Sequence, residues 1–213
     1  MFDLCNLLFY SVYNHISNIL KGSLIKITNV IQLEHREPVS IKIQSLATIV
    51  AIIAAVIVPQ FFHWLGSVSG SGTAPGVAFS PMHLPIIIVG FLAGPAVGGI
   101  AGLLGPVAAH YISGMPPATQ LPFMMVELFG YGFAAGLLSY IKMNLTVKTF
   151  LAMIAGRFLR MIACSFAFYV LGNSKMTPLG IWRSIPASLP GIVLQIVLIP
   201  LVVFWVENKS NNK

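Results

Sequence analysis

The chain has 213 residues, of which 57% are hydrophobic and only 8% charged, and its mean hydropathy is +0.88. Between Lys42 and Lys142 the only acid or base besides histidine is Glu127, and a soluble domain cannot cover its surface with so few charges. We therefore predict an integral membrane protein whose net charge of +7 lies in loops facing anionic lipid, rather than a nucleic-acid-binding protein. Cys5 and Cys164 are too far apart in the sequence to suggest a disulfide framework, and we interpret both as packing residues.

The first 42 residues lack the short apolar core and small-residue cleavage site of a cleaved signal peptide. Five apolar side chains in this segment fall on one face of a helix, which suggests a helix lying in the membrane interface. They are Leu4, Leu8, Val12, Ile16 and Ile19. An extension without fixed structure, or a start assigned too early, fits the same residues. We divide the chain into an interfacial or cytoplasmic extension over 1–42, a transmembrane domain over 43–207 and a cytoplasmic tail over 208–213.

Four apolar stretches are each about as long as the 20 residues that a helix needs to cross a membrane. They cover residues 46–65, 121–141, 149–171 and 187–206. The stretch 84–113 is too long for one upright helix, and Pro95 follows Gly94 at its middle. Two short helices that meet at this Gly-Pro pair would raise the number of crossings from five to six.

Loop charges decide between five crossings and six. With six crossings, both ends of the chain lie on one side of the membrane. That side carries Lys21, Lys26, Arg36, Lys42, Lys142, Lys148, Lys209 and Lys213, and the other side carries Lys175 and Arg183. With five crossings this asymmetry nearly disappears, so we predict an all-α bundle of six transmembrane helices with cytoplasmic termini. The external loops are then 66–83, 114–120 and 172–186, and the first of these, rich in Gly and Ser, is either a lid or a plain connector.

Small residues recur at a spacing of four in three apolar stretches. Two contain glycines, Gly90, Gly94, Gly98 and Gly102 in one and Gly132 and Gly136 in the other, and the third contains Ala47, Ala51 and Ala55. Helices in lipid gain little from hiding apolar surface and associate through close contact, which small residues permit. We expect the glycines to pack the protein's own helices. The alanine stripe fits either internal packing or a flat surface for another membrane protein.

The sequence lacks the motifs of an energy-converting or hydrolytic enzyme. It contains no GxxxxGK[ST] phosphate loop, no HExxH pair, no nucleophile elbow, and Asp3 is its only aspartate. We therefore do not expect an enzyme. A chain of this kind that moves a solute uphill must obtain the energy from another protein or from a coupling ion.

Together, these features resemble one family of membrane proteins. A core of six predicted helices, an AxxxAxxxA first helix, and the stretch "FSPMHLPIIIVGFLAGPAVGGIAGLLGP" leading into "ISGMPP" look like the substrate-binding S components of energy-coupling factor (ECF) vitamin transporters. The resemblance covers residues 43–207. It implies a small-molecule vitamin substrate captured from outside, a multi-pass protein of a prokaryotic plasma membrane, and docking of Ala47, Ala51 and Ala55 on a transmembrane coupling subunit that two ATPase subunits drive.

Three ionisable residues at membrane depth are candidates for ligand binding, because such residues are costly in lipid. Glu127 lies six residues from the external end of its predicted helix, and Arg157 and Arg160 share a face of the next helix. One interpretation is that Glu127 and Arg160 neutralise each other. The other is that an arginine binds a carboxylate or phosphate of the ligand with its planar pair of donors.

Further candidates are aromatic and amide groups that, if they face one cavity, suit an organic ligand. They are Phe79, Tyr111, Gln120, Tyr131 and Gln195, and His83 is a candidate as well. His63, His83 and His110, with Met82 beside the second, could instead bind a transition metal, as in metal-specific S components. Those components, however, carry their Met-His pair at the amino terminus. We expect neither a cofactor nor a resident metal.

Our leading hypothesis is an ECF S component for a small water-soluble vitamin or precursor. The buried arginines favour an anion, and the "SPMHLP" segment resembles that of S components assigned to pantothenate, so the resemblance implies a pantothenate-like ligand. The alternatives are an ion-coupled secondary transporter or channel and a cobalt or nickel S component. An intramembrane enzyme is disfavoured by the shortage of acids and bases, and an assembly factor without a ligand fits the same sequence.

Overall fold

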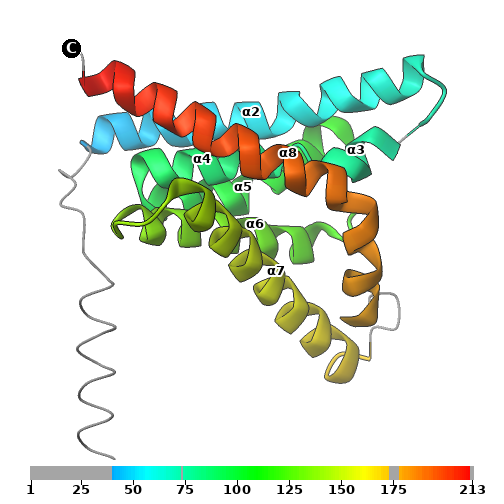
Figure 1. The fold of residues 1–213 in the computed structure, drawn as a ribbon. Coiled ribbons are helices and arrows are strands. Elements are labelled where there is room, and N and C mark those ends of the chain that lie inside the picture. Colours follow the sequence, from blue (N-terminus) through cyan, green and yellow to red (C-terminus); the bar gives the residue numbers. More distant parts are fainter. Residues whose placement is uncertain (1–39, 73, 173–177, 212–213) are drawn as a thin grey trace, which may run out of the picture.

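A computed structural model describes residues 40–72, 74–172 and 178–211 of the protein, and each element in these ranges is an α-helix (Figure 1). The helices are α2 (Ile41–Val68), α3 (Ala74–Phe79), α4 (His83–Ala93), α5 (Pro95–Ser113), α6 (Leu121–Ser139), α7 (Leu145–Tyr169) and α8 (Pro178–Asn211). Within the described ranges, five stretches are long and apolar enough to cross a membrane: Ile41–Val68, Pro95–Ser113, Leu121–Ser139, Leu145–Tyr169 and Pro186–Lys209. The protein is thus a helical bundle of the membrane type. The predicted interfacial helix and Cys5 lie outside the described residues.

The stretch 84–113 forms two helices, as the sequence predicts. Gly94 separates α4 from α5 with a φ of 94°, a backbone conformation that suits glycine, and Pro95 is the first residue of α5. α4 has only 11 residues, about 16 Å of helix, and cannot cross a bilayer by itself. In the described residues there are five long apolar helices and two short ones, α3 and α4, so the predicted short second helix is present but six crossings stay a prediction.

The short helix α4 lies at the centre of the bundle. It packs against α2, α5, α6 and α8, and most of its side chains are buried. Glycines bring its neighbours into backbone contact: a Cβ atom on Gly98 would overlap the backbone of Gly132, and one on Gly102 would overlap the backbone of Leu128. The predicted internal packing of these glycines is confirmed, and it follows from the need for close approach in lipid.

The alanine stripe of α2 faces the interior of the bundle. Ala51 and Ala55 are buried, Ala47 packs against the same core, and a Cβ atom on Gly105 of α5 would lie 3.3 Å from the Cβ of Ala55. The larger side chains on α2 point outward instead, as Ile49, Val50, Ile53 and Ile57 show. In this conformation the protein's own helices cover Ala51 and Ala55, which agrees with the internal-packing alternative. Docking of the stripe on a coupling subunit stays a prediction.

The helices extend further into the predicted loops than the sequence suggested. The loop predicted over 66–83 contains the end of α2 and the short helix α3, while the loop predicted over 114–120 separates α5 from α6 as expected. α8 begins at Pro178, within the third predicted loop, and continues to Asn211 through most of the predicted tail. Three prolines lie inside it, Pro186, Pro190 and Pro200, and Figure 1 shows that its first part is bent away from the rest.

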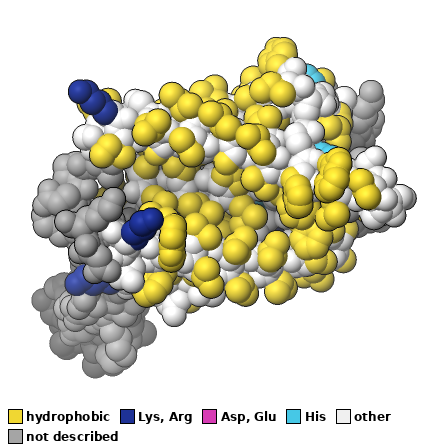
Figure 2. Space-filling view, turned by 90° about the horizontal axis from the view of Figure 1, so that it is seen from above, with side chains coloured by type: hydrophobic (Ala, Val, Ile, Leu, Met, Phe, Trp, Pro, Cys, Tyr) yellow, Lys and Arg dark blue, Asp and Glu magenta, His cyan; other side chains and the backbone are white. Residues whose placement is uncertain are grey.

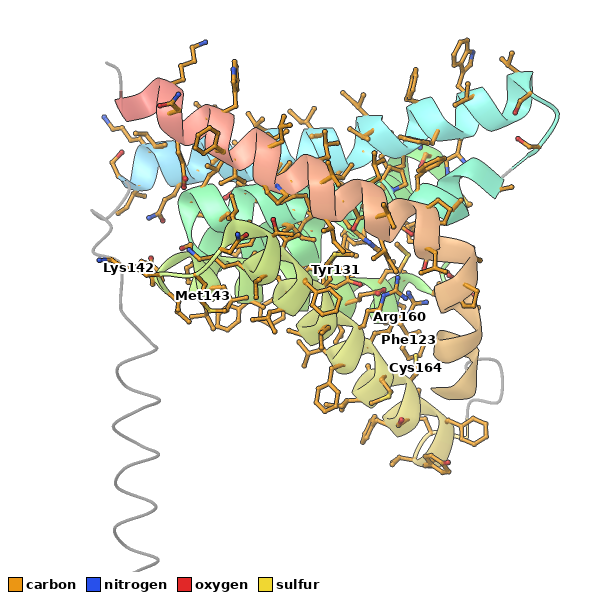
Figure 3. All side chains as sticks on the ribbon, viewed as in Figure 1. Phe123, Tyr131, Lys142, Met143, Arg160 and Cys164 are labelled. Carbon is orange, nitrogen blue, oxygen red and sulfur yellow. The ribbon has the colours of Figure 1, made fainter. Side chains whose placement is uncertain are left out.

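Three lysines of the described residues lie at one end of the bundle. α2 begins and α8 ends at the same end of the molecule (Figure 1), where Lys42 and Lys209 lie in the first and last turns of these helices. Lys142, between α6 and α7, lies at this end as well (Figure 3). We call this the lysine end, and the other the loop end. Figure 2 looks onto the outer side of α2 and α8 and shows that hydrophobic side chains cover most of this surface between the lysine end and the loop end.

Candidate functional site

A buried ion pair joins α6 to α7. Nη1 of Arg160 donates to Oε2 of Glu127 at 2.5 Å, and the hydroxyl of Tyr131 donates to Oε1 of the same carboxylate at 2.8 Å. Glu127 is 1% exposed and the Arg160 side chain 24%. Tyr131 and Glu127 are one helical turn apart, so both reach the same point on α7. The predicted alternative in which Glu127 and Arg160 neutralise each other agrees with this geometry.

Small residues let α6 and α7 come close enough to form this pair. A Cβ atom on Gly156 would overlap the ring of Tyr131 and lie 2.6 Å from the carbonyl oxygen of Glu127, while one on Gly130 would lie 2.8 Å from Cα of Gly156. The ion pair is therefore supported by direct backbone contact. Figure 3 shows Arg160 on α7 close to Tyr131 and to the side chain of Phe123.

His83, the first residue of α4, extends the cluster toward the centre of the bundle. Its side chain is buried, and its ring packs edge-on against Tyr131 with 4.8 Å between the ring centroids. The structure thus brings together four of the residues that the sequence singled out, His83, Glu127, Tyr131 and Arg160, from three different helices.

Arg157 contacts a different partner. Its Nη2 donates to the hydroxyl of Ser188 on α8 at 3.1 Å, so the two arginines of α7 connect this helix to α6 and to α8. In the described part of the chain, Arg157 has no carboxylate partner. The site therefore contains two guanidinium groups and one carboxylate, which leaves an excess positive charge at membrane depth, where charges are normally paired.

A buried amide joins α8 to the segment before α4. Nε2 of Gln195 donates to the carbonyl oxygens of Phe79 at 3.1 Å and Ser80 at 3.3 Å. The Ser80 carbonyl also accepts the backbone N–H of His83, so Gln195 is connected to the start of α4. One turn earlier in α8, a Cβ atom on Gly191 would lie 2.5 Å from the carbonyl oxygen of Ala78. The sequence named Gln195 but gave no means of pairing it with a segment more than 100 residues away.

Other predicted residues lie apart from this cluster. Tyr111 is 83% exposed near the end of α5, next to the ring of His110. Gln120 is partly exposed directly before α6 and does not cap that helix with its side chain. The ring of Phe79 packs on Phe62 with 5.3 Å between centroids, so its backbone oxygen contacts Gln195 while its ring contacts α2.

The three histidines of the metal hypothesis do not converge. His63 packs against Gly76 of α3, His83 packs against Tyr131, and Nδ1 of His110 lies 2.7 Å from the carbonyl oxygen of Pro116. In the described residues, no group of three or more His, Cys, Asp or Glu side chains is placed to hold a metal ion. Cys164 is buried between Phe123 and Ala167, as expected of a packing residue.

These observations define a multi-pass membrane protein with a charged, hydrogen-bonded cluster at the junction of α4, α6, α7 and α8. Residues 16–203 match the family model described as "ECF transporter, substrate-specific component", and the chain belongs to this family. It is thus a substrate-binding subunit of ECF transporters, as the sequence resemblance suggested. A comparison with curated proteins found no match, and neither did a comparison with solved structures.

Proposed function

We propose that this chain captures a small, water-soluble anion from outside a prokaryotic cell and delivers it inward as the S component of an ECF importer. A vitamin or vitamin precursor with a carboxylate, such as pantothenate, fits this role. The coupling subunit and two ATPase subunits supply the energy. The loop end of the bundle faces outward and the lysine end faces the cytoplasm, in agreement with the distribution of basic residues.

The observation that carries the choice of an anion is the charge imbalance of the site. Glu127 has one negative charge and is already bonded to Arg160 and Tyr131, whereas Arg157 contacts the neutral hydroxyl of Ser188 and, among the described residues, no carboxylate. Within the same residues, Nε of Arg160 is buried without a hydrogen-bond partner. An entering carboxylate would pair with the unbalanced charge and accept hydrogen bonds from these donors. A neutral molecule could accept the hydrogen bonds but would leave the charge unpaired, and a cation would be repelled.

The test compares Arg157→Met with Ser188→Ala in proteoliposomes that contain the chain together with its coupling and ATPase subunits. We expect ATP-dependent uptake of at least one acid from a panel of pantothenate, biotin and folate. Arg157→Met should weaken binding of the transported acid by about 10-fold or more, because the carboxylate loses its guanidinium partner. Ser188→Ala keeps the guanidinium group and should change binding by about 3-fold or less.

Two results would contradict the proposal in different ways. Uptake by vesicles that contain this chain alone, driven by a proton or sodium gradient, would identify an ion-coupled carrier. ATP-dependent uptake of thiamine or riboflavin, unaffected by Arg157→Met, would leave the S-component role in place and exclude the anion.

A further inference from the structure

The amide of Gln195 is held in one orientation by its neighbours. Both groups that it contacts, the backbone oxygens of Phe79 and Ser80, can only accept hydrogen bonds. The nitrogen of the amide must therefore face them, since a carbonyl oxygen in that place would have no donor to contact. The side-chain oxygen of Gln195 is then directed away from α3 and the start of α4.

This side-chain oxygen has no hydrogen-bond partner in the described structure. Gln195 is 1% exposed, and its Oε1 atom is inaccessible to solvent. A buried carbonyl oxygen without a donor is unfavourable, and at membrane depth the supply of water is small. The two hydrogen bonds from Nε2 account for the nitrogen of the amide, but no group in the described residues accounts for its oxygen.

Gln195 and the Arg157 contact lie on the same face of α8. Ser188 and Gln195 are both buried and are separated by seven residues, which is two turns or about 10 Å of helix. An oxygen without a hydrogen-bond donor therefore lies about two turns toward the lysine end from a guanidinium group that contacts no carboxylate among the described side chains. A molecule that satisfied both would have an anionic group at one end and a hydroxyl or N–H group at the other.

We propose that Oε1 of Gln195 is a specificity-determining acceptor that binds a hydroxyl or N–H group of the transported acid, at the end opposite to its carboxylate. This inference rests on the proposed function, since it takes the arginine-containing cluster as the binding site. Gln195 has two roles: its nitrogen fixes the segment before α4, and its oxygen selects among acids. Acids of the same length without a donor at the far end are bound more weakly.

The test uses pairs of acids that differ by one hydroxyl group, measured by calorimetry on the full chain in lipid nanodiscs. One pair is pantothenate and its analogue with hydrogen in place of the terminal hydroxyl, and the other is 6-hydroxyhexanoate and hexanoate. The wild type should bind the hydroxylated member of a pair about 10- to 100-fold more tightly. Gln195→Met should reduce this ratio to about 2-fold or less.

The ratio separates recognition from structural support. If Gln195→Met weakens both members of a pair equally and the ratio is unchanged, Gln195 only fixes the local structure and the inference is wrong. A wild type that binds both members equally well, in a manner sensitive to Arg157→Met, overturns the inference and leaves the proposed function standing. If the wild type binds neither pair, both the inference and the proposal of an anionic substrate are wrong. Co-purification with the coupling subunit then tests the S-component role separately.

Discussion

The interface between α4, α5 and α6 and the loop-end half of α8 are held in place by different means. In the first region, which we call the glycine core, Gly90, Gly98, Gly102, Gly132 and Gly136 bring backbones into direct contact. In the second, over residues 186–195, the buried face of α8 consists of Ser188, Gly191 and Gln195. Two of these three are held by hydrogen bonds to α7 and to the segment before α4.

This difference indicates which part of the protein can move. Without a hydrophobic driving force between helices, close backbone contact gives a large summed dispersion energy that is lost when helices separate. A few side-chain hydrogen bonds are worth about 1 kcal/mol each. We therefore expect the glycine core to stay fixed during binding, while the loop-end half of α8 and α3 separate to admit a solute. Three substitutions, from the largest expected effect to the smallest, test this division.

Gly132→Ala should have the largest effect. Its added methyl group would overlap the backbone of Gly98, which cannot move without displacing α5. We expect a loss of about 3 kcal/mol or more in the free energy of unfolding, seen as low yield and early thermal unfolding in detergent. Gly105→Ala is the matched control, because its methyl group would meet only the side chains of Ala55 and Ile86 at 3.3 and 3.6 Å. Equal stability of the two variants would contradict the rigid glycine core.

Glu127→Gln should have the second-largest effect. It leaves the charge of Arg160 without its partner at membrane depth, and the guanidinium group is mostly buried. We expect a loss of about 2 kcal/mol in stability, less than the roughly 3 to 5 kcal/mol of a fully buried pair, because the arginine retains some exposure. The double variant Glu127→Gln/Arg160→Met should recover most of this loss in thermal unfolding measurements. No recovery in the double variant would show that Glu127 contributes through contacts other than this ion pair.

Gly191→Ala should have the smallest effect on stability and a local effect on dynamics. Its methyl group would overlap the carbonyl oxygens of Ala78 and Phe79, but α3 has only 6 residues and can shift. We expect a loss of about 1 kcal/mol or less and faster amide hydrogen exchange in residues 66–83, with unchanged exchange in α5 and α6. Leu189→Ala, at an exposed position of α8, is the control. Faster exchange throughout the bundle would mean that the two regions are not independent.

The sequence predicted the features that have a strong local signal. Gly94 and Pro95 broke an apolar stretch that was too long for one helix, and the break is at that point in the structure. Glu127 and Arg160 were the rare charges in apolar helices, so their pairing could be proposed without coordinates. The glycine spacing indicated close helix contact, which the structure contains.

The features that the sequence did not predict depend on distant contacts. In a helix with apolar residues on all sides, the pattern does not distinguish the face toward lipid from the face toward other helices. The direction of the alanine stripe, with Ala55 in the core, therefore had to come from the structure. The contact of Gln195 with Phe79 joins segments 116 residues apart, and the outward position of Tyr111 depends on how α5 ends. The helix α3 forms in a Gly- and Ser-rich segment that has little helical propensity.

The short length of α4 sets how deep the site lies. The turn before α5 is level with the last turn of α6, since a Cβ atom on Gly136 would overlap Pro95. From there, α4 rises only about 16 Å to His83, roughly half of a hydrocarbon layer about 30 Å thick. In the proposed orientation, a solute that diffuses from outside to His83 and Gln195 has crossed about half of the hydrocarbon layer before any energy is supplied. The ATP-dependent step then has to open a path of about 15 Å to the cytoplasm, through the part of the bundle where the backbones are in closest contact.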